Sequence, residues 1–434
     1  MVKVRPVRGM RDILPEEMIQ RQKVLDTLRE VFETFGFLPL ETPALERWEL
    51  LSAKGAGGPE VLEETYRFKD RAGRPVGLRY DLTVPLARVV ASNPTLPLPF
   101  KRYQISRVWR YGDVAKGRLR EFWQADVDVV GSVSMLADAE VLACAITAFK
   151  RLGFKDFTVR LNHRKILSAL IRYSGVEESK ILDAYRAIDK LDKVGLTGVE
   201  KELLMRGVST ESAKKILDLI GLSGKADSVL AEAEGLLSED AEGIEGIEDL
   251  RNLITYLKDL VAEPKLKVDL SLARGLDYYT GPIFEFSGAE NIGSLAGGGR
   301  YDKLIGLISG RDVPATGISL GVERIIEVMR EKGMLAVEKS KVKVFVAKTS
   351  DEVIGATLNL VAMLREKGIP AEFDLRERSL KKQLEYADSR EIDYVLIVGK
   401  RELERDSVKL RDMRNRVEKD VRIDDLTSIL ENLF

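Results

Sequence analysis

The chain has 434 residues but only one cysteine, Cys144, and only one histidine, His163. A lone cysteine excludes a disulfide within the chain, and the apolar, helix-like surroundings of Cys144 favour an inert core thiol. A lone histidine excludes a metal site made of several imidazoles and argues against a Ser-His-Asp machine. We expect His163, at a predicted strand-to-helix junction, to have a structural or surface role.

Long apolar runs and an excess of positive charge are also missing. No apolar stretch approaches the roughly 18 residues that a membrane helix needs, and the N-terminal residues lack the apolar core of a signal peptide. We therefore expect a cytoplasmic protein without a membrane partner. The formal net charge is −1, so any nucleic acid would have to be bound by local basic patches.

The pattern of apolar and polar residues divides the chain into blocks. Residues 1–165 and 264–331 alternate strand-like and helix-like segments, and the run AGGGRYDKLIG predicts a glycine-rich turn at 296–306. Residues 166–263 show helical periodicity alone, which suggests an all-helical insertion. Residues 332–341 are a polar linker, and residues 342–434 alternate strands with helices, which predicts a small α/β domain with a mainly parallel sheet.

The most strand-like region, residues 100–131, is rich in cations, with seven inside twenty residues. The loop GDVAKGR between its two predicted strands is small and polar. Permanently charged, bidentate arginine side chains in such an arrangement suit phosphate groups, although an edge strand also often carries solvated cations. The cations are Lys101, Arg102, Arg107, Arg110, Lys116, Arg118 and Arg120.

The second strand of this hairpin alternates with a period of two residues. Its apolar face consists of Trp123, Ala125, Val127 and Val129, and its polar face consists of Gln124, Asp126 and Asp128. An amide and a carboxylate beside a phosphate site, here Gln124 and Asp128, can hold an amino acid and accept a hydrogen bond from it. A solvated strand face is the alternative.

Two further segments carry polar side chains that suit a ligand. Asp81 and Thr83 share one face at the end of a predicted strand, where they can accept from an ammonium group or can cap the helix that follows. Arg274 precedes Tyr278 and Tyr279, a group that could equally be core packing.

The segment GISLGVER, residues 317–324, predicts a strand followed by a helix. A helix N-terminus favours phosphate, and Arg324 adds positive charge there. By itself this spacing is a weak signal.

In this order, the segments resemble the class II aminoacyl-tRNA synthetases. Pro43 after an apolar strand is similar to motif 1 of that class, residues 107–128 to motif 2, and residues 317–324 to motif 3. RGLDYY (274–279) and AGGGRYD (296–302) resemble the two histidine signatures of histidyl-tRNA synthetases. The resemblance covers nearly the whole chain, and the helical insertion is similar to that of the archaeal and eukaryotic type.

The resemblance implies an α+β catalytic domain, built on an antiparallel sheet with helices, with an all-helical insertion and a C-terminal α/β domain. Residues 1–165 would carry motifs 1 and 2, and residues 264–331 the histidine signatures and motif 3. Residues 166–263 would form the insertion, which we suggest clamps the acceptor arm of tRNA, and residues 342–434 would bind the anticodon.

The activity implied is that of a histidine–tRNA ligase. L-histidine and ATP would form histidyl-adenylate and pyrophosphate, and histidine would then pass to the 3′ end of tRNA(His). ATP would be a substrate that brings Mg²⁺ with it, and no bound organic cofactor is expected. Motif 1 builds the dimer interface in this family, so the resemblance also implies a homodimer.

Carried over residue by residue, the resemblance gives the catalytic roles to Arg110 and Arg274. Both would contact the α-phosphate, and Arg110 would also hold the carboxylate of histidine. Arg324 would bind the γ-phosphate, with Arg118 as a further ATP-binding residue. Arg110 and Arg274 would thus also belong to the histidine site. Asp81 and Thr83 would receive the ammonium group of histidine, and Gln124 would help place its backbone end. Asp128, Tyr278 or Tyr279, and Tyr301 would surround its imidazole.

One position departs from the family pattern. The family usually carries an acidic residue two places after the α-phosphate arginine, associated with the adenine amino group, but here that place is Gly112. Either Asp113 substitutes through a shifted backbone, or backbone groups hold the adenine.

The nearest alternative is a catalytically silent paralogue that regulates histidine biosynthesis. Such proteins lack the C-terminal domain and parts of the catalytic set, whereas this chain has the tail and all three arginines. Another class II synthetase would not explain RGLDYY, and a non-catalytic RNA-binding protein would not explain the phosphate-binding arginines.

Overall fold

The structure, a computed structural model, describes residues 4–53, 58–273, 278–288 and 293–433. The chain forms two compact units: one holds residues 1–11 and 24–334, and the other holds residues 12–23 and 335–434. Helix α1 (Pro15–Thr34) contributes residues to both units. None of the helices in the described part of the chain is long and apolar enough to cross a membrane.

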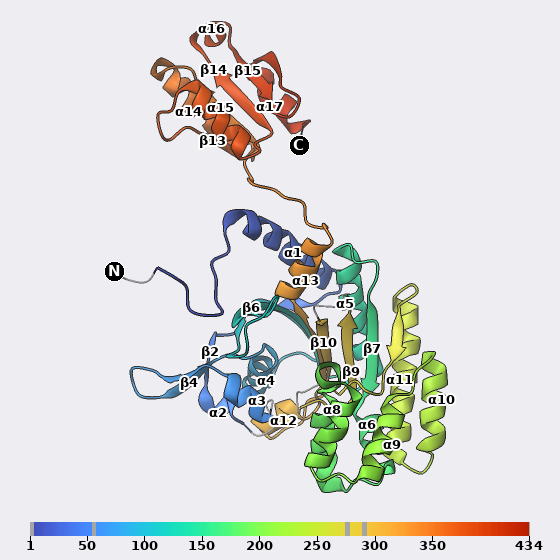
Figure 1. Ribbon diagram of the computed structural model, residues 1–434. Helices are drawn as coiled ribbons and strands as arrows, with labels where there is room; N and C mark the ends of the chain where they lie inside the picture. The colour runs from blue at the N-terminus through green and yellow to red at the C-terminus, as the bar shows by residue number, and fades with distance from the viewer. Residues whose placement is uncertain (1–3, 54–57, 274–277, 289–292, 434) are drawn as a thin grey trace. The chain divides into compact units, whose positions relative to one another are not determined.

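An eight-stranded sheet is the centre of the first unit (Figure 1). Its inner strands pair antiparallel, and only the short edge strands pair parallel to their neighbours. The predicted α+β fold with an antiparallel sheet is confirmed. In spatial order the strands are β1 (Leu38–Pro39), β5 (Phe100–Trp109), β6 (Glu121–Val130), β11 (Ala315–Gly321), β10 (Ser294–Arg300), β9 (Pro282–Ser287), β7 (Thr158–His163) and β8 (Leu266–Val268).

The prediction of a glycine-rich turn at residues 296–306 is wrong. Its glycines lie in β10, between β9 and β11, and helix α12 (Leu304–Ser309) follows. A Cβ atom at Gly298 would collide with the backbone oxygen of Gly317, and one at Gly299 would lie 2.6 Å from the oxygen of Pro282. Glycine serves close packing of backbone against backbone here, which a local sequence pattern does not distinguish from a turn.

Helices cover the sheet and its flanks. Helix α5 (Met135–Arg151) packs on β6, β11 and α11, and its Cys144 is fully buried, which raises the pKa of the thiol. Helix α4 (Thr83–Ser92) packs on α12, and α13 (Val322–Glu331) packs on β6. A small antiparallel sheet and two short helices lie beside them: β2 (Leu45–Arg47), α2 (Trp48–Leu51), α3 (Gly58–Glu64), β3 (Arg67–Lys69) and β4 (Pro75–Leu78).

Every element between β7 and β8 is helical. Figure 1 shows these helices beside the β7 edge of the sheet, where α11 contacts β7 and α10 contacts β8. Helices α6 to α9 share an apolar core that includes Ile188, Val199, Leu203 and Ile216. The helices are α6 (Arg164–Tyr173), η1 (Glu178–Lys180), α7 (Ile181–Ile188), α8 (Leu191–Met205), α9 (Thr210–Ile220), α10 (Ala226–Leu236) and α11 (Ala241–Leu260).

His163 ties this helical region to the sheet. It ends β7, and its Nδ1 accepts from the backbone N–H of Lys165 (3.1 Å) at the start of α6. Its Nε2 lies 3.3 Å from a carboxylate oxygen of Asp249 in α11. The side chain is fully buried, so its role is structural.

The second unit contains a five-stranded sheet in the order β13-β12-β14-β15-β16. Strands β12, β13 and β14 are parallel, but β15 pairs antiparallel with β14 and β16 pairs antiparallel with β15, so the sheet that was expected to be mainly parallel is mixed. The charged sequence of β16 hid this edge strand from the apolar pattern. The elements are β12 (Val344–Lys348), η2 (Asp351–Val353), α14 (Ile354–Glu366), β13 (Ala371–Phe373), α15 (Leu380–Ser389), β14 (Tyr394–Val398), α16 (Lys400–Leu403), β15 (Ser407–Asp412), β16 (Val417–Arg422) and α17 (Ile423–Glu431).

Candidate active site

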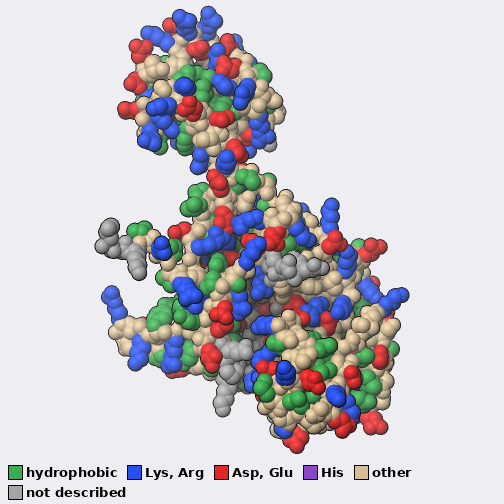
Figure 2. All heavy atoms as spheres, viewed as in Figure 1, with side chains coloured by type: hydrophobic (Ala, Val, Ile, Leu, Met, Phe, Trp, Pro, Cys, Tyr) green, Lys and Arg blue, Asp and Glu red, His purple; other side chains and the backbone are tan. Residues whose placement is uncertain are grey.

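A cavity of about 610 Å³ lies over β6, β10 and β11 of the large sheet, a size that is usual for small-molecule sites. On the face of the molecule seen in Figure 2, acidic and basic side chains are interspersed.

Arg274 lies outside the described residues. The other predicted site residues all line the cavity: Asp81, Thr83, Arg110, Arg118, Gln124, Asp128, Tyr278, Tyr279, Tyr301 and Arg324.

Asp128 is held by two side chains on other strands or loops. Tyr301 donates a hydrogen bond to its Oδ1, and Arg102, its register partner on β5, forms an ion pair of 2.8 Å with Oδ2. Burial raises the pKa of Asp128, an effect that the Arg102 guanidinium opposes. Burial also raises the pKa of Tyr301 well above its ordinary value. Asp128 is therefore a fixed acceptor in a buried wall, and its remaining lone pairs can take a further donor.

The seven cations of the hairpin do not gather at one phosphate site, as their spacing had suggested. Of these, only Arg110 and Arg118 line the cavity. Arg102 is fully buried, and Lys101 forms an ion pair of 2.6 Å with Glu140 of α5. Strand alternation sends neighbouring cations to opposite faces, so density along the sequence does not become density in space.

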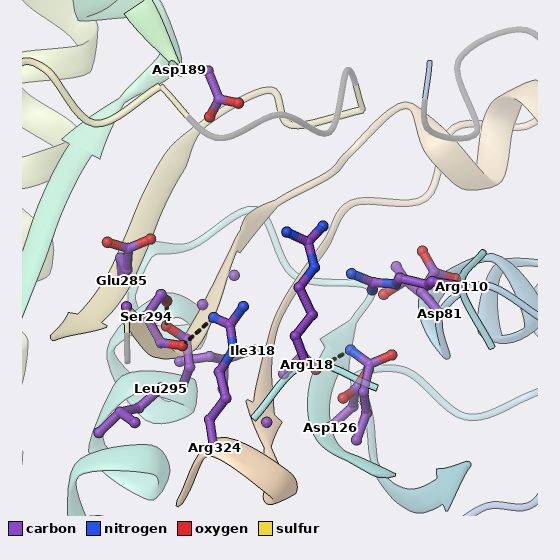
Figure 3. A pocket seen from close by; sticks show the side chains of 18 of the residues that line it. Asp81, Arg110, Arg118, Asp126, Asp189, Glu285, Ser294, Leu295, Ile318 and Arg324 are labelled. Carbon is purple, nitrogen blue, oxygen red and sulfur yellow. Dashed lines mark hydrogen bonds between the residues drawn. The ribbon is translucent and has the colours of Figure 1, made fainter. Parts of the chain in front are cut away.

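Three arginines that reach the cavity suit an anionic ligand: two come from the loop between β5 and β6, and the third comes from α13. Arg110 donates from Nε to the backbone oxygen of Tyr80 (3.1 Å), and its guanidinium lies 4.2 Å from the centre of the Tyr80 ring. Arg324, in the first turn of α13, donates to the backbone oxygen of Ser294 (2.7 Å). Figure 3 shows Arg118 and Arg324 extending into the same open space, with Arg110 to one side next to Asp81. This positive group suits phosphate oxygens.

Asp81 and Thr83 do not lie at a strand end, because β4 ends at Leu78. Thr83 is the first residue of α4, and Asp81 Oδ1 accepts from the backbone N–H of Val84 (3.0 Å). Burial raises the pKa of Asp81, while the Val84 amide and the Arg110 guanidinium lower it. The helix cap and the ligand group, which the sequence left as alternatives, are thus compatible: Asp81 anchors the helix and also lines the cavity.

Aromatic and amide side chains complete the predicted set. Gln124 donates from Nε2 to the hydroxyl of Ser319 on β11 (2.5 Å), which fixes its amide against the cavity floor. The Tyr278 ring packs edge-on against Tyr279 and Tyr301, at centroid distances of 4.9 and 5.9 Å. All three tyrosines are buried, so they serve as both core and cavity lining.

Glu64 is a cavity residue that the sequence analysis did not identify. It ends α3, and its Oε1 lies 2.9 Å from the position that a Cβ atom at Gly112 would occupy. The Tyr80 hydroxyl donates to Oε2 (3.0 Å), and Arg118 Nη2 lies 3.9 Å from Oε1. No local signal could have found this pairing, because nearly fifty residues separate the two positions.

The helical region supplies one wall of the cavity. Its contributing residues are Ile188, Asp189, Leu191, Asp192 and Lys193. Arg160 of β7 joins this wall to the sheet through ion pairs with Asp192 (3.1 Å), Asp269 (2.9 Å) and Glu285 (2.9 Å). In Figure 3, Asp189 faces the arginines from across the cavity.

The arrangement combines two chemistries in one space. The buried carboxylates of Asp81, Asp126 and Asp128 can accept from ammonium and N–H groups, while the arginines can bind anionic oxygens. A ligand pair of an amino acid and a polyphosphate satisfies both.

Comparison with known proteins agrees with this geometry. The sequence model of the family described as histidyl-tRNA synthetase matches residues 9–325, and that of an anticodon-binding domain matches residues 341–433. The chain is 42% identical to the histidine–tRNA ligase of Korarchaeum cryptofilum, with 98% of each chain covered, and 41% identical to that of Gloeobacter violaceus, with 94% of each covered. A crystal structure of histidyl-tRNA synthetase from Nostoc sp. PCC 7120 is similar over 100% of both chains, with a TM-score of 0.87 and 32% identity.

Proposed function

The chain belongs to the histidyl-tRNA synthetase family, and we propose that it joins L-histidine to tRNA(His) in two steps at this cavity, with ATP as the energy source. The observation that carries the proposal is the presence of Arg110, Arg324 and the Asp128–Tyr301 pair in one cavity. The arginines can bind the phosphates of a nucleotide, and the buried Asp128–Tyr301 pair can form a hydrogen bond with an imidazole ring.

In the first step, a carboxylate oxygen of histidine attacks the α-phosphorus of ATP. A C–O–P bond forms while the bond between that phosphorus and the bridging oxygen of pyrophosphate breaks. The nucleophile is already ionised, so the step needs no general base. Its barrier comes from bringing anions together, and guanidinium groups held in place lower it.

Arg110 holds the α-phosphate and the histidine carboxylate in this proposal. Its contacts with Tyr80 keep the guanidinium in one place, so little reorganisation is required as charge develops. Arg324 binds the γ-phosphate, with Arg118 beside it. Arg274, which lies outside the described residues, is proposed as the second catalytic arginine.

Histidine lies with its ammonium group at Asp81 and Thr83 and its backbone end at Gln124. Asp128, Tyr301 and either Tyr278 or Tyr279 surround the ring. An apolar amino acid would leave the remaining lone pairs of the buried Asp128 carboxylate without a donor from the ligand, and a site of that kind rejects ligands that lack the hydrogen-bonding group by a large factor.

In the second step, a hydroxyl of the 3′-terminal ribose of tRNA attacks the histidyl carbonyl carbon, and AMP leaves with the phosphate oxygen. The basic loop between β5 and β6 adjoins Arg110, so we place the acceptor end of the tRNA there. The five-stranded C-terminal unit would bind the anticodon through local patches such as Lys381–Lys382 and residues 411–416.

Mg²⁺ would accompany the phosphates of ATP and neutralise part of their charge. Mg²⁺ commonly binds through one or two carboxylates together with the phosphates of the nucleotide. A homodimer formed through the motif 1 region around Pro43, and a cytoplasmic location, are part of the same proposal.

The decisive test is ATP–pyrophosphate exchange measured with each of the twenty amino acids in turn. Exchange with histidine alone supports the proposal, and charging of tRNA(His) tests the second step. No exchange with any amino acid would point instead to a catalytically silent paralogue.

A further inference from the structure

Asp126 is a carboxylate that the proposed roles leave unused. It lies two residues before Asp128 on the same face of β6, opposite Gln104 of β5 and Ser319 of β11. The side chain is 2% exposed and lines the cavity. Its Oδ1 has no hydrogen-bond partner among the described residues. A buried carboxylate oxygen without a donor is costly, so its presence beside a ligand cavity points to a donor on the ligand.

Asp126 lies where negative charge is in excess over positive charge. Arg102 on β5 lowers its pKa, but that guanidinium already forms the ion pair with Asp128. Ser319 on β11 also lowers the pKa, whereas Asp128 and Asp81 raise it. Desolvation is the largest contribution, and the resulting pKa is about 7. An additional cation in the cavity would remove this imbalance.

The spacing of the two carboxylates suits a protonated imidazole ring. Residues i and i+2 of a strand lie about 6.6 Å apart, which leaves room for a five-membered ring whose two nitrogens each face one carboxylate. Imidazolium has an N–H on both nitrogens, whereas neutral imidazole has only one. A single carboxylate would not distinguish the two forms by hydrogen-bond count.

We propose that Asp126 is a second ring-binding carboxylate, and that Asp126 and Asp128 together bind the substrate side chain as imidazolium, with one carboxylate on each ring N–H. This inference rests on the proposed function, because it names the form in which that site takes histidine. Asp126 is then a specificity residue for the charge state of the ring as well as for its shape.

Binding is consequently linked to a proton. Below about pH 7, the empty site can carry the proton on Asp126 and pass it to the ring of neutral histidine. Above that pH, both groups are deprotonated and binding takes up a proton from solvent, so the KM for histidine rises by up to about tenfold per pH unit. A ligand whose ring stays neutral forms no ion pair with Asp126, so its KM should depend on pH less steeply.

The experiment compares histidine with 1,2,4-triazol-3-ylalanine in pyrophosphate exchange at about pH 7 and pH 8.5. The triazole ring has the same size but is far less basic, so it stays neutral. With the wild-type enzyme, KM for histidine should rise with pH more steeply than KM for the triazole analogue. Parallel pH profiles for the two substrates would overturn the proposal, and this comparison requires no variant.

Asp126→Asn tests the residue itself. It should lower kcat/KM for histidine by about 30-fold or more, lower that for the triazole analogue much less, and remove the extra pH dependence. Ser319→Ala is the matched control, because it removes the hydroxyl next to Asp126 but keeps the carboxylate. This variant should retain the preference for histidine. Equal losses on both substrates in Asp126→Asn would show a structural role or a contact with the ammonium group, and would overturn the assignment.

The two levels of proposal fail differently. Absence of histidine-dependent exchange in the wild-type enzyme would refute the proposed function. If exchange is present but the Asp126→Asn variant discriminates histidine from the triazole analogue as well as the wild-type enzyme does, only the role of Asp126 is refuted. A thermal shift produced by ATP alone shows whether the variant is folded with an intact nucleotide site.

Discussion

The carboxylate of Glu64 occupies the space into which a side chain at Gly112 would extend, with Oε1 2.9 Å from the position of the missing Cβ. Gly112 is the place where the family pattern calls for an acid. The sequence had suggested Asp113 or backbone groups as substitutes. Glu64, held by the Tyr80 hydroxyl, instead brings a carboxylate to this part of the cavity from a segment before the hairpin.

Glu64→Ala is therefore expected to raise the KM for ATP by about tenfold, the effect of losing one hydrogen bond to a charged acceptor. It should also weaken the preference for ATP over GTP, because a carboxylate accepts from the amino group of adenine but repels the carbonyl oxygen at the same place in guanine. Pyrophosphate exchange at varied nucleotide concentration measures both. Asp113→Ala is the matched control, and a larger effect there would assign the adenine contact to Asp113.

Tyr301→Phe should raise the KM for histidine about tenfold and leave the KM for ATP within about twofold, because it removes one hydrogen bond at Asp128 without disturbing the charge balance. Equal effects on both substrates would remove Asp128 and Tyr301 from the histidine site.

Asp128→Ala should lose histidine affinity far more than ATP affinity, but it also leaves the buried Arg102 without its ion-pair partner. Removing one member of a buried pair typically costs about 3–5 kcal/mol of folding stability. We therefore expect a clearly lower Tm for Asp128→Ala than for Tyr301→Phe, measured on ligand-free protein. Similar Tm values for the two variants would contradict the proposed dependence of Arg102 on Asp128.

Arg274→Ala should slow adenylate formation by roughly 10²-fold or more, the usual loss when one fixed donor to a developing charge is removed. Single-turnover formation of histidyl-adenylate is the appropriate measurement. Pyrophosphate exchange near the wild-type rate would contradict the assignment of Arg274 as a catalytic residue, which rests on the sequence resemblance.

Asp126→Asn should stabilise the ligand-free protein at alkaline pH. The pKa of Asp126 is about 7 in the folded state and 3.8 as an ordinary aspartate, so the native state binds more protons than the unfolded state between these values. The free energy of unfolding then falls as pH rises through this window, and an asparagine escapes that loss. The difference in free energy of unfolding between Asp126→Asn and wild type should be more favourable to the variant at about pH 8 than at about pH 5, by on the order of 2 kcal/mol.

Thermal melting of both proteins at the two pH values measures this difference. A Tm difference that is the same at both pH values would show that Asp126 does not titrate in this range.

Asp192→Ala should loosen the helical wall of the cavity. Arg160 keeps Asp269 and Glu285 on the sheet side, so only its link to the helical region is lost. Asp192 is 71% exposed, and we expect less than about 1 kcal/mol of lost stability. Faster hydrogen exchange over residues 188–195, with little change in the sheet, is the expected result. The control in the helical region is Glu211→Ala, at a side chain that is 81% exposed, and it should leave these amides unchanged.

The kinds of element, their order and most of the chemistry could be predicted from local patterns in the sequence. The two-residue alternation of β6 placed Gln124 and Asp128 on one face, and the helical periodicity after β7 predicted the strand-free region. These features depend on neighbours close in the chain, and local periodicity reports them directly. The motif residues themselves were also recognisable, because their types and spacing are set by the ligand groups that they would bind.

The contacts between residues far apart in the chain became known from the three-dimensional fold. It set Arg102 against Asp128, filled the place beside Gly112 with Glu64, and turned the glycine run of β10 into the centre of a sheet. Each of these follows from strand register and burial over long sequence separations, for which local patterns carry no information. Asp126 is a further case: the alternation in the sequence predicted the face of β6 on which it lies, but the absence of a donor to its Oδ1 among the described residues depends on the side chains packed around it.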